Sequence, residues 1–142
     1  MFQWKEEYLT GNEQVDKEHQ EIFRLVGKLL QSTGDETDDD IDESVRFLAH
    51  YTVCHFENEE KLMMESDYPH RELHKKQHDD FIVQVSALIE RVSHEKNRNK
   101  NLQDIKMVVV EWLVEHVLGS DKMMATCYRR WQLDQCGGKL PV

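Results

Sequence analysis

Two pairs of potential metal ligands, separated by a proline, constrain this chain more than any other feature. The first pair is His55 and Glu59. The second is His74 and His78, and the members of each pair are four residues apart. That spacing places both side chains of a pair on one face of an α-helix. Proline is tolerated only in the first turn of a helix, so Pro69 marks the end of one helix and the start of the next. Two consecutive antiparallel helices would then turn their ligand faces toward each other.

Apolar residues recur every three or four positions along most of the chain, which is typical of amphipathic helices. We expect helices over about 15–32, 40–65, 70–94 and 101–118, with a short fifth helix over about 121–133. Short loops, including a polar one at 97–101, join them. The fold class predicted is all-α: an antiparallel up-down-up-down four-helix bundle in a single domain, 1–142. Residues 1–14 form an N-terminal arm packed along the bundle (15–133), and residues 134–142 form an irregular tail.

Polar residues enter the apolar seam of each helix at one level of the bundle. The seam positions are His19, His55, Glu59, His74, His78 and His116. Asp121 follows His116 by five residues, which leaves the two side chains about 140° apart on an ideal helix. We therefore predict a helix end or a π-type bulge at residues 117–121, which would turn Asp121 inwards.

These seven polar side chains in one core layer point to metal. A single core histidine is usually a satisfied polar group, but seven such groups would bury several unpaired atoms at about 1–3 kcal/mol each. Two divalent metals would remove that cost. Nitrogen and oxygen ligands without thiolate suit iron, manganese or zinc, and two bridging carboxylates suit a pair of metals about 3–4 Å apart.

Charge and cysteine usage narrow the function classes. The 142 residues include 28 acidic and 18 basic side chains, a net charge of -10. Such a surface repels phosphate backbones and anionic lipid, so we expect no nucleic-acid and no membrane partner. The chain has no apolar run of about 20 residues and no signal-peptide pattern at its start. Three cysteines without a CxxC spacing form no disulfide framework. The localisation expected is cytoplasmic.

An acidic run over 35–43 holds seven carboxylates in nine residues. A calcium loop is one interpretation, but the run lacks glycine at the sixth and glutamate at the twelfth position of an EF-hand loop. The preferred interpretation is a helix N-terminus, where carboxylates meet the positive end of the helix dipole.

The arrangement resembles hemerythrin, in particular the bacterial hemerythrin-like proteins, over residues 1 to about 130. The matching signature is an early histidine followed by HxxxE, HxxxH and HxxxxD motifs. The local sequence also matches at Trp4, the segment 15–19, His55-Phe56, Tyr68-Pro69 and Trp112-Leu113.

The resemblance implies two iron ions with a bridging oxo or hydroxo group, and reversible binding of dioxygen. One iron would be held by His74, His78 and His116. The other would be held by His19 and His55, and would keep an open position for dioxygen. Glu59 and Asp121 would bridge both. An apolar oxygen pocket would be lined by Ile22, Phe56, Trp112, Leu113 and Val117.

The remaining polar residues near this layer receive other interpretations. His50, His70 and His94 are expected at the surface, with His70 also a candidate partner of the ligands. Further candidates for hydrogen bonds to ligand imidazoles are Asp16, Tyr51 and Glu60. Cys54 is expected to point away from the ligand face.

The leading functional hypothesis is carriage, storage or delivery of dioxygen to a consumer in the cytoplasm. The alternative is a domain that senses oxygen, redox state or nitric oxide at the same di-iron site and alters its contact with a signalling partner. A di-iron peroxidase or oxidase is disfavoured, because no additional acid or base and no substrate-binding motif is found near the pocket. A ferritin-like di-iron bundle would need Glu-x-x-His pairs, which the ligand helices do not offer.

Overall fold

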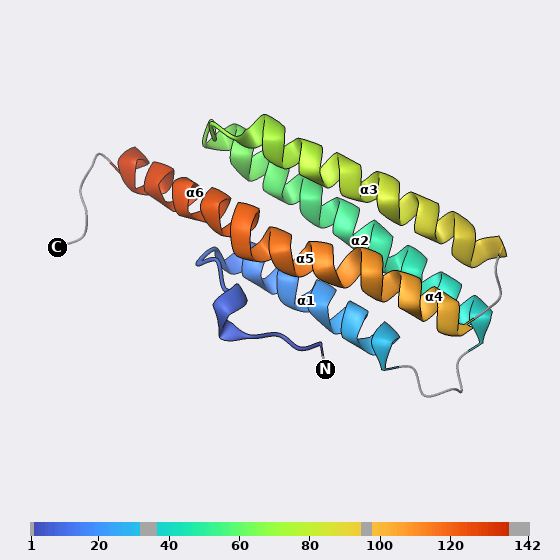
Figure 1. The fold of residues 1–142 in the computed structure, drawn as a ribbon. Coiled ribbons are helices and arrows are strands. Elements are labelled where there is room, and N and C mark those ends of the chain that lie inside the picture. The colour runs from blue at the N-terminus through green and yellow to red at the C-terminus, as the bar shows by residue number, and fades with distance from the viewer. Residues whose placement is uncertain (1, 32–36, 95–97, 137–142) are drawn as a thin grey trace.

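Four long helices form the described part of the chain, as the sequence predicts. The structure is a computed structural model that describes residues 2–31, 37–94 and 98–136. The first three helices are α1 (Glu13–Leu30), α2 (Asp38–Glu65) and α3 (Arg71–His94). The fourth runs from Arg98 to Gln135 without a break. Successive helices run in opposite directions along one bundle, so both ligand-bearing ends of α2 and α3 meet at their connection (Figure 1).

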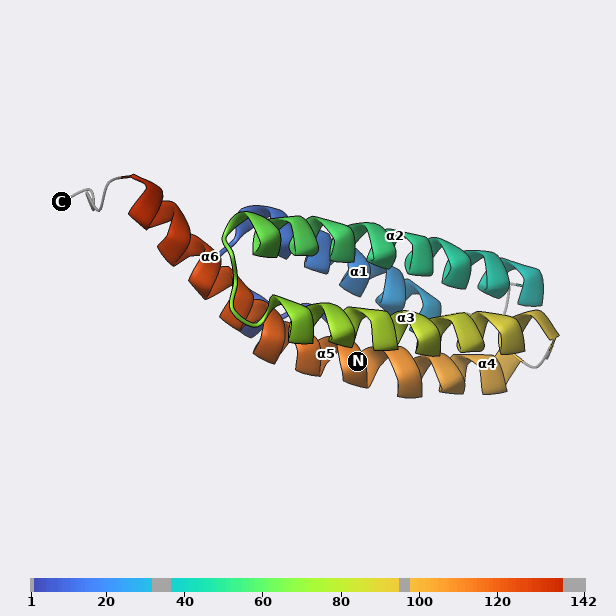
Figure 2. The same cartoon turned by 90° about the horizontal axis from the view of Figure 1, so that it is seen from above.

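The fourth helix contradicts the prediction of a separate fifth helix. Its segments α4 (Arg98–Ile105), α5 (Glu111–His116) and α6 (Lys122–Gln135) are joined by two π-helical turns, η2 (Lys106–Val110) and η3 (Val117–Asp121). A helix end at 117–121 was one of the two irregularities predicted, but the backbone stays right-handed helical on both sides of that segment. A π turn absorbs one extra residue without ending the helix. The last part, α6, leaves the bundle at an angle (Figure 2).

The starts of α1 and α2 follow from local capping. Asn12 accepts a hydrogen bond from the backbone N–H of Val15. Thr37 and Asp40 form a reciprocal capping box at α2, so the described part of the acidic run serves a helix N-terminus. Asp35 and Glu36 lie outside the described residues.

Two predicted irregular segments are partly helical. Residues 98–101 of the predicted polar loop form the first turn of α4, and 134–135 of the predicted tail end α6. Few apolar residues mark these turns, so periodicity gave no signal there. The predicted helix end at 32–34 and the tail residues 137–142 lie outside the described residues.

Two apolar clusters enclose the level of the predicted ligands. The larger includes Val26, Leu88 and Ile105, and fills the bundle toward α4. The smaller consists of Val15, Met63, Tyr68 and Met124 and lies toward the α2–α3 connection. The polar layer is therefore shielded from water along both directions of the bundle axis.

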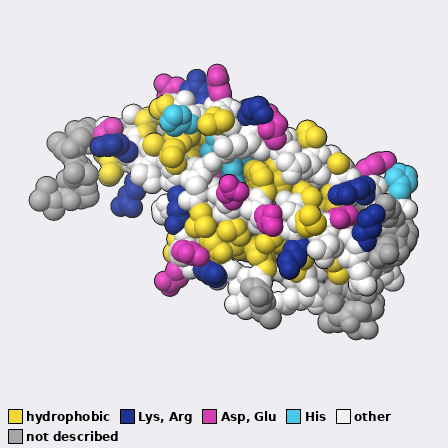
Figure 3. All heavy atoms as spheres, viewed as in Figure 1, with side chains coloured by type: hydrophobic (Ala, Val, Ile, Leu, Met, Phe, Trp, Pro, Cys, Tyr) yellow, Lys and Arg dark blue, Asp and Glu magenta, His cyan; other side chains and the backbone are white. Residues whose placement is uncertain are grey.

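The N-terminal arm packs on α1 through aromatic rings. Phe2 stacks on Phe23 with ring centres 4.8 Å apart, and Trp4 meets the same ring edge-on at 5.1 Å. The face in Figure 3 carries hydrophobic side chains across its middle, with charged ones among and around them. Within the described ranges, no helix is long and apolar enough to cross a membrane.

Candidate metal centre

The structure brings all seven predicted ligands together in one buried cluster. They come from all four helices, and each has at most 5 % of its surface exposed. Their donor atoms form two groups, within each of which the atoms lie no more than 4.8 Å apart. The first group is Glu59, His74, His78, His116 and Asp121. The second is His19, His55, Glu59 and Asp121. We call these the three-histidine and two-histidine half-sites.

Each shared carboxylate divides its two oxygens between the half-sites. Glu59 Oε1 lies 3.0 Å from His78 Nε2 and 3.6 Å from His74 Nε2 in the three-histidine half-site. Its Oε2 lies 3.2 Å from His55 Nε2 and 3.4 Å from His19 Nε2 on the other side. Glu59 thus has the orientation of a bridge between two cations.

Asp121 repeats this arrangement from the opposite wall. Its Oδ1 lies 3.0 Å from the Nε2 atoms of both His74 and His116, and its Oδ2 lies 2.9 Å from His19 Nε2. The π-helical turn η3 gives Asp121 this position. In a π turn residues five apart are hydrogen-bond neighbours, so Asp121 shares the face of His116. The irregularity predicted at 117–121 is confirmed.

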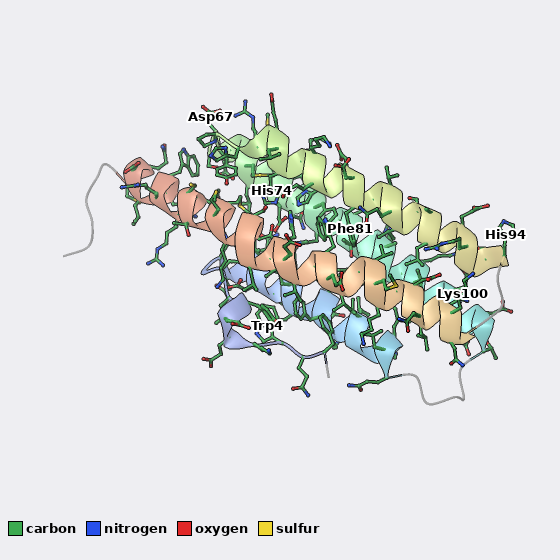
Figure 4. All side chains as sticks on the ribbon, viewed as in Figure 1. Trp4, Asp67, His74, Phe81, His94 and Lys100 are labelled. Carbon is green, nitrogen blue, oxygen red and sulfur yellow. The ribbon has the colours of Figure 1, made fainter. Side chains whose placement is uncertain are left out.

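A side-chain hydrogen bond ties the π turn η3 to α3. Ser120 donates its hydroxyl to Gln77 Oε1 at 2.7 Å. Gln77 lies between the two ligand histidines of α3 in the sequence. The bond therefore fixes the turn that carries Asp121 against the helix that carries His74 and His78. Figure 4 labels His74 and Phe81 on this helix.

Carboxylates outside the cluster orient two of the imidazoles. His55 Nδ1 lies 2.7 Å from Glu18 Oε1, and His78 Nδ1 lies 3.0 Å from Glu60 Oε2. Such bonds leave Nε2 free to face a metal. The sequence predicts Glu60 correctly but misses Glu18. Two features could have pointed to Glu18: it stands next to His19 in the sequence, and its helix packs against α2.

The other two predicted partners have different contacts. Asp16 accepts hydrogen bonds from the backbone N–H and the hydroxyl of Thr10, both at 2.7 Å, and so fixes the turn before α1. Tyr51 is half-buried. Burial is the main cause that raises the pKa of Tyr51, and the charge of Glu18 raises it as well. Among the hydrogen bonds described, neither side chain contacts a ligand imidazole.

Charges inside the cluster stabilise the ionised carboxylates. Burial alone raises the pKa of Glu59, but His55 and the close imidazoles of His19 and His74 outweigh burial and hold it well below its usual range. The pKa of Asp121 is lowered in the same way by its histidine neighbours, against burial and the repulsion of Glu59. Burial lowers the pKa of His116, which favours the neutral form that binds metal.

The donor geometry fits cations. His116 Nε2 lies 3.2 Å from His78 Nε2 and 3.1 Å from His74 Nε2. Adjacent ligands about 2.1 Å from one metal ion would be separated by about 3 Å. Both oxygens of Glu59, together with His19 Nε2 and Asp121 Oδ1, are buried without a hydrogen bond of good geometry. A cation in each half-site would satisfy all four atoms.

The five predicted pocket residues lie in the larger apolar cluster or against it. Ile22, Phe56, Leu113 and Val117 are buried, and Trp112 is partly buried. The Phe56 ring stacks on His78 at 3.8 Å, and Trp112 stacks on His116 at 4.2 Å. These two rings therefore cover imidazoles of the three-histidine half-site, while Phe56 also lies 6.0 Å from the His55 ring.

The remaining histidines and the cysteines lie outside the centre. The side chains of His50, His70 and His94 are exposed, as predicted. Figure 4 shows His94 at the end of α3 remote from His74. All three cysteines are free and exposed, and Cys54 Sγ lies 4.0 Å from the Nε2 atom of the exposed His50.

The fold and the buried cluster define a class: four-helix proteins with a histidine and carboxylate cation site inside the bundle. The family model of the hemerythrin HHE cation binding domain matches residues 10–128. The chain belongs to this hemerythrin family.

Named relatives agree with that assignment. The chain is 30% identical to the bacteriohemerythrin of Clostridium acetobutylicum over 86% of this chain and 97% of the relative. It is 31% identical to the myohemerythrin of Theromyzon tessulatum over 84% and 88%. A crystal structure of a hemerythrin mutant superposes with a TM-score of 0.78 at 25% identity, covering 90% of this chain and 97% of that one.

Proposed function

We propose that the cluster holds two iron ions and that the protein binds dioxygen reversibly. The observation that carries the proposal is the pairing of two half-sites through two shared carboxylates, each with one oxygen directed to either side. His74, His78 and His116 would hold one ion. His19 and His55 would hold the other. When bound, a ferrous pair would supply the two electrons that reversible dioxygen binding requires.

The unequal half-sites support a place for dioxygen. The three-histidine half-site offers five protein donors, and the two-histidine half-site offers four. We therefore place dioxygen at the second, with fewer protein ligands. The five pocket residues are all apolar, so they exclude water and supply no proton, and both properties favour release of dioxygen unchanged. The names of the relatives, bacteriohemerythrin and myohemerythrin, support the same assignment.

A spectroscopic oxygen cycle tests this function. The iron-loaded protein is reduced without air, its visible spectrum is recorded before and after air is admitted, and oxygen is then removed. We expect two irons per chain and an absorption band that appears with air and disappears when oxygen is removed. A protein oxidised chemically serves as the control spectrum. Rapid, irreversible conversion to the control spectrum would contradict a carrier and favour the sensor.

A further inference from the structure

The turn that carries Asp121 is the least regular part of the metal centre. Of the seven ligands, Asp121 alone lies in a π turn, η3, whereas the other six lie in regular α-helical segments. A π turn holds one residue more than the α-helical turn it replaces. A shift of that extra residue past Asp121 would rotate its side chain by about 100° around the helix. The place of η3 in the fourth helix therefore decides whether Asp121 faces the centre.

Few side chains of η3 can hold the turn in place. Leu118 is 38% exposed, and a Cβ added to Gly119 would meet no atom within 4 Å. Val117 is buried in the larger apolar cluster, but apolar burial is not directional. Ser120 is the remaining residue, and its hydroxyl donates to Gln77 Oε1 at 2.7 Å. Among the hydrogen bonds described, this one alone joins a side chain of η3 that is not a metal ligand to another helix.

Gln77 belongs to the part of α3 that carries metal ligands, and it lies between the two ligand histidines of that helix. Gln77, Ser120 and His74 also line one surface cleft. Asp121 must meet both half-sites at once. Its Oδ1 lies 3.0 Å from His74 Nε2, and its Oδ2 lies 2.9 Å from His19 Nε2. Because the two oxygens face opposite half-sites, a rotation of η3 changes both contacts together.

We propose that Ser120 and Gln77 are positioning residues that keep Asp121 shared between the two metal ions. The inference rests on the two-ion centre of the proposed function, but not on its dioxygen step. Without the hydrogen bond, η3 can shift and Asp121 no longer meets both half-sites. The two-histidine half-site should lose more affinity, because Asp121 is one of its four protein donors and one of five in the three-histidine half-site.

Titration of the metal-free protein with ferrous iron, without air and in competition with a chelator, measures both dissociation constants. In Ser120→Ala and in Gln77→Leu we expect the more weakly held ion to lose about ten-fold in affinity and the other ion to lose less. Ser120→Thr keeps the hydroxyl and should retain the wild-type ratio of the two constants. Gln84→Leu is the matched control, because Gln84 is exposed on the same helix, seven residues after Gln77.

A double variant separates the hydrogen bond from two independent effects. Ser120→Ala combined with Gln77→Leu should lose no more affinity than either change alone, because each already removes the same bond. Gln77→Ala replaces Gln77→Leu if the latter folds poorly. Additive losses, equal weakening of both ions, or wild-type constants in both single variants would overturn the inference. A wild-type chain that takes up a single ion would instead overturn the proposed two-ion function.

Discussion

The ligand side chains differ in how many other ligands they contact, and His74 has several such contacts. Its Nε2 lies close to Asp121 and to His116 within the three-histidine half-site. Loss of this imidazole removes one of the five donors of that half-site and leaves Asp121 Oδ1 with His116 as its remaining imidazole neighbour.

We predict that His74→Ala lowers the iron content from two to at most one per chain. Elemental analysis of the purified, reconstituted protein measures it. His70→Ala is the matched control, since His70 lies one turn earlier on the same side of the chain but is exposed. Two irons per chain in His74→Ala would exclude the ligand assignment.

Glu18 is expected to act through His55 rather than on the metal. Its carboxylate orients the imidazole, and removing such a partner typically weakens metal binding about 10–100-fold. Glu18→Gln should show a loss of this size for one metal ion of the pair in a chelator competition. Glu21→Gln is the control, because that carboxylate pairs only with Arg24 among the interactions described. Equal affinities in the two variants would show that the Glu18 contact has no role in binding.

At least two ligand histidines must lose protons when metal binds. Burial lowers the pKa of His55, but the charge of Glu59 and the contact with Glu18 outweigh burial and raise this pKa to about 10. Burial likewise opposes the Asp121 and Glu59 contacts that raise the pKa of His74 to about 9. In the metal-free fold this stabilisation is fully present below the unfolded pKa of 6.5 and is lost as pH rises through the folded values.

Metal uptake near neutral pH should therefore release at least about two protons per chain and become tighter as pH rises. Calorimetric titration in two buffers with different heats of ionisation measures this number. Heats that do not depend on the buffer would contradict the charge states derived for the metal-free cluster.

The sequence predicts the seven ligand positions because a spacing of four on a helix leaves little freedom in side-chain direction. Glu18 was missed for the opposite reason. Its contact with His55 depends on how α1 is rotated against α2. Packing of whole helices decides that rotation, and residue spacing within one helix does not record it.

At the scale of elements, the fourth helix depends on its π turns. The turn η3 was predictable, because a spacing of five between two ligands is incompatible with one face of an α-helix. The turn η2 was not, because Ile105 and Val109 are four apart and fit an ordinary α-helix. The predicted separate fifth helix was wrong because the chain continues through η3 as a π turn, in which Ser120 bonds to Gln77 of α3.

Gly119 is not required for the π turn. An added Cβ there would meet no atom within 4 Å, and the backbone is right-handed. Gly119→Ala should stabilise the protein by about 0.5–1 kcal/mol and retain both irons. Thermal unfolding measures the change.

Gly11→Ala should have the opposite effect, because Gly11 has a φ of 91° that strains any other residue. A lower unfolding temperature or loss of iron in Gly119→Ala would show that the turn needs glycine.

At the scale of the whole molecule, the bundle and the centre are separable contributions to stability. The larger apolar cluster spans the arm and the helices on one side of the ligand layer. It should therefore keep the metal-free chain helical. Metal adds stability because it binds only the folded state, by about 2.7 kcal/mol per site at a hundredfold excess over the dissociation constant.

Removal of metal should lower the unfolding temperature but preserve most of the helical signal. Circular dichroism at 25 °C and on heating tests both parts, and restored metal should reverse the change. A metal-free chain without helical signal would show that the centre is needed for the bundle to form.

Periodicity was sufficient to predict the bundle, because each helix buries one apolar stripe. An apolar cavity of about 150 Å³ between α2, α3 and the start of the fourth helix could not be predicted, because it is the space left between packed side chains of three helices. No single segment encodes that space.

The central claim is that seven side chains hold two metal ions that share Glu59 and Asp121. Anomalous X-ray diffraction at the iron edge, on crystals of the iron-loaded protein, tests it most directly. We predict two peaks per chain, one next to the Nε2 atoms of the three-histidine half-site and one next to those of His19 and His55. A single peak, or a second one outside this cluster, would contradict the dinuclear centre.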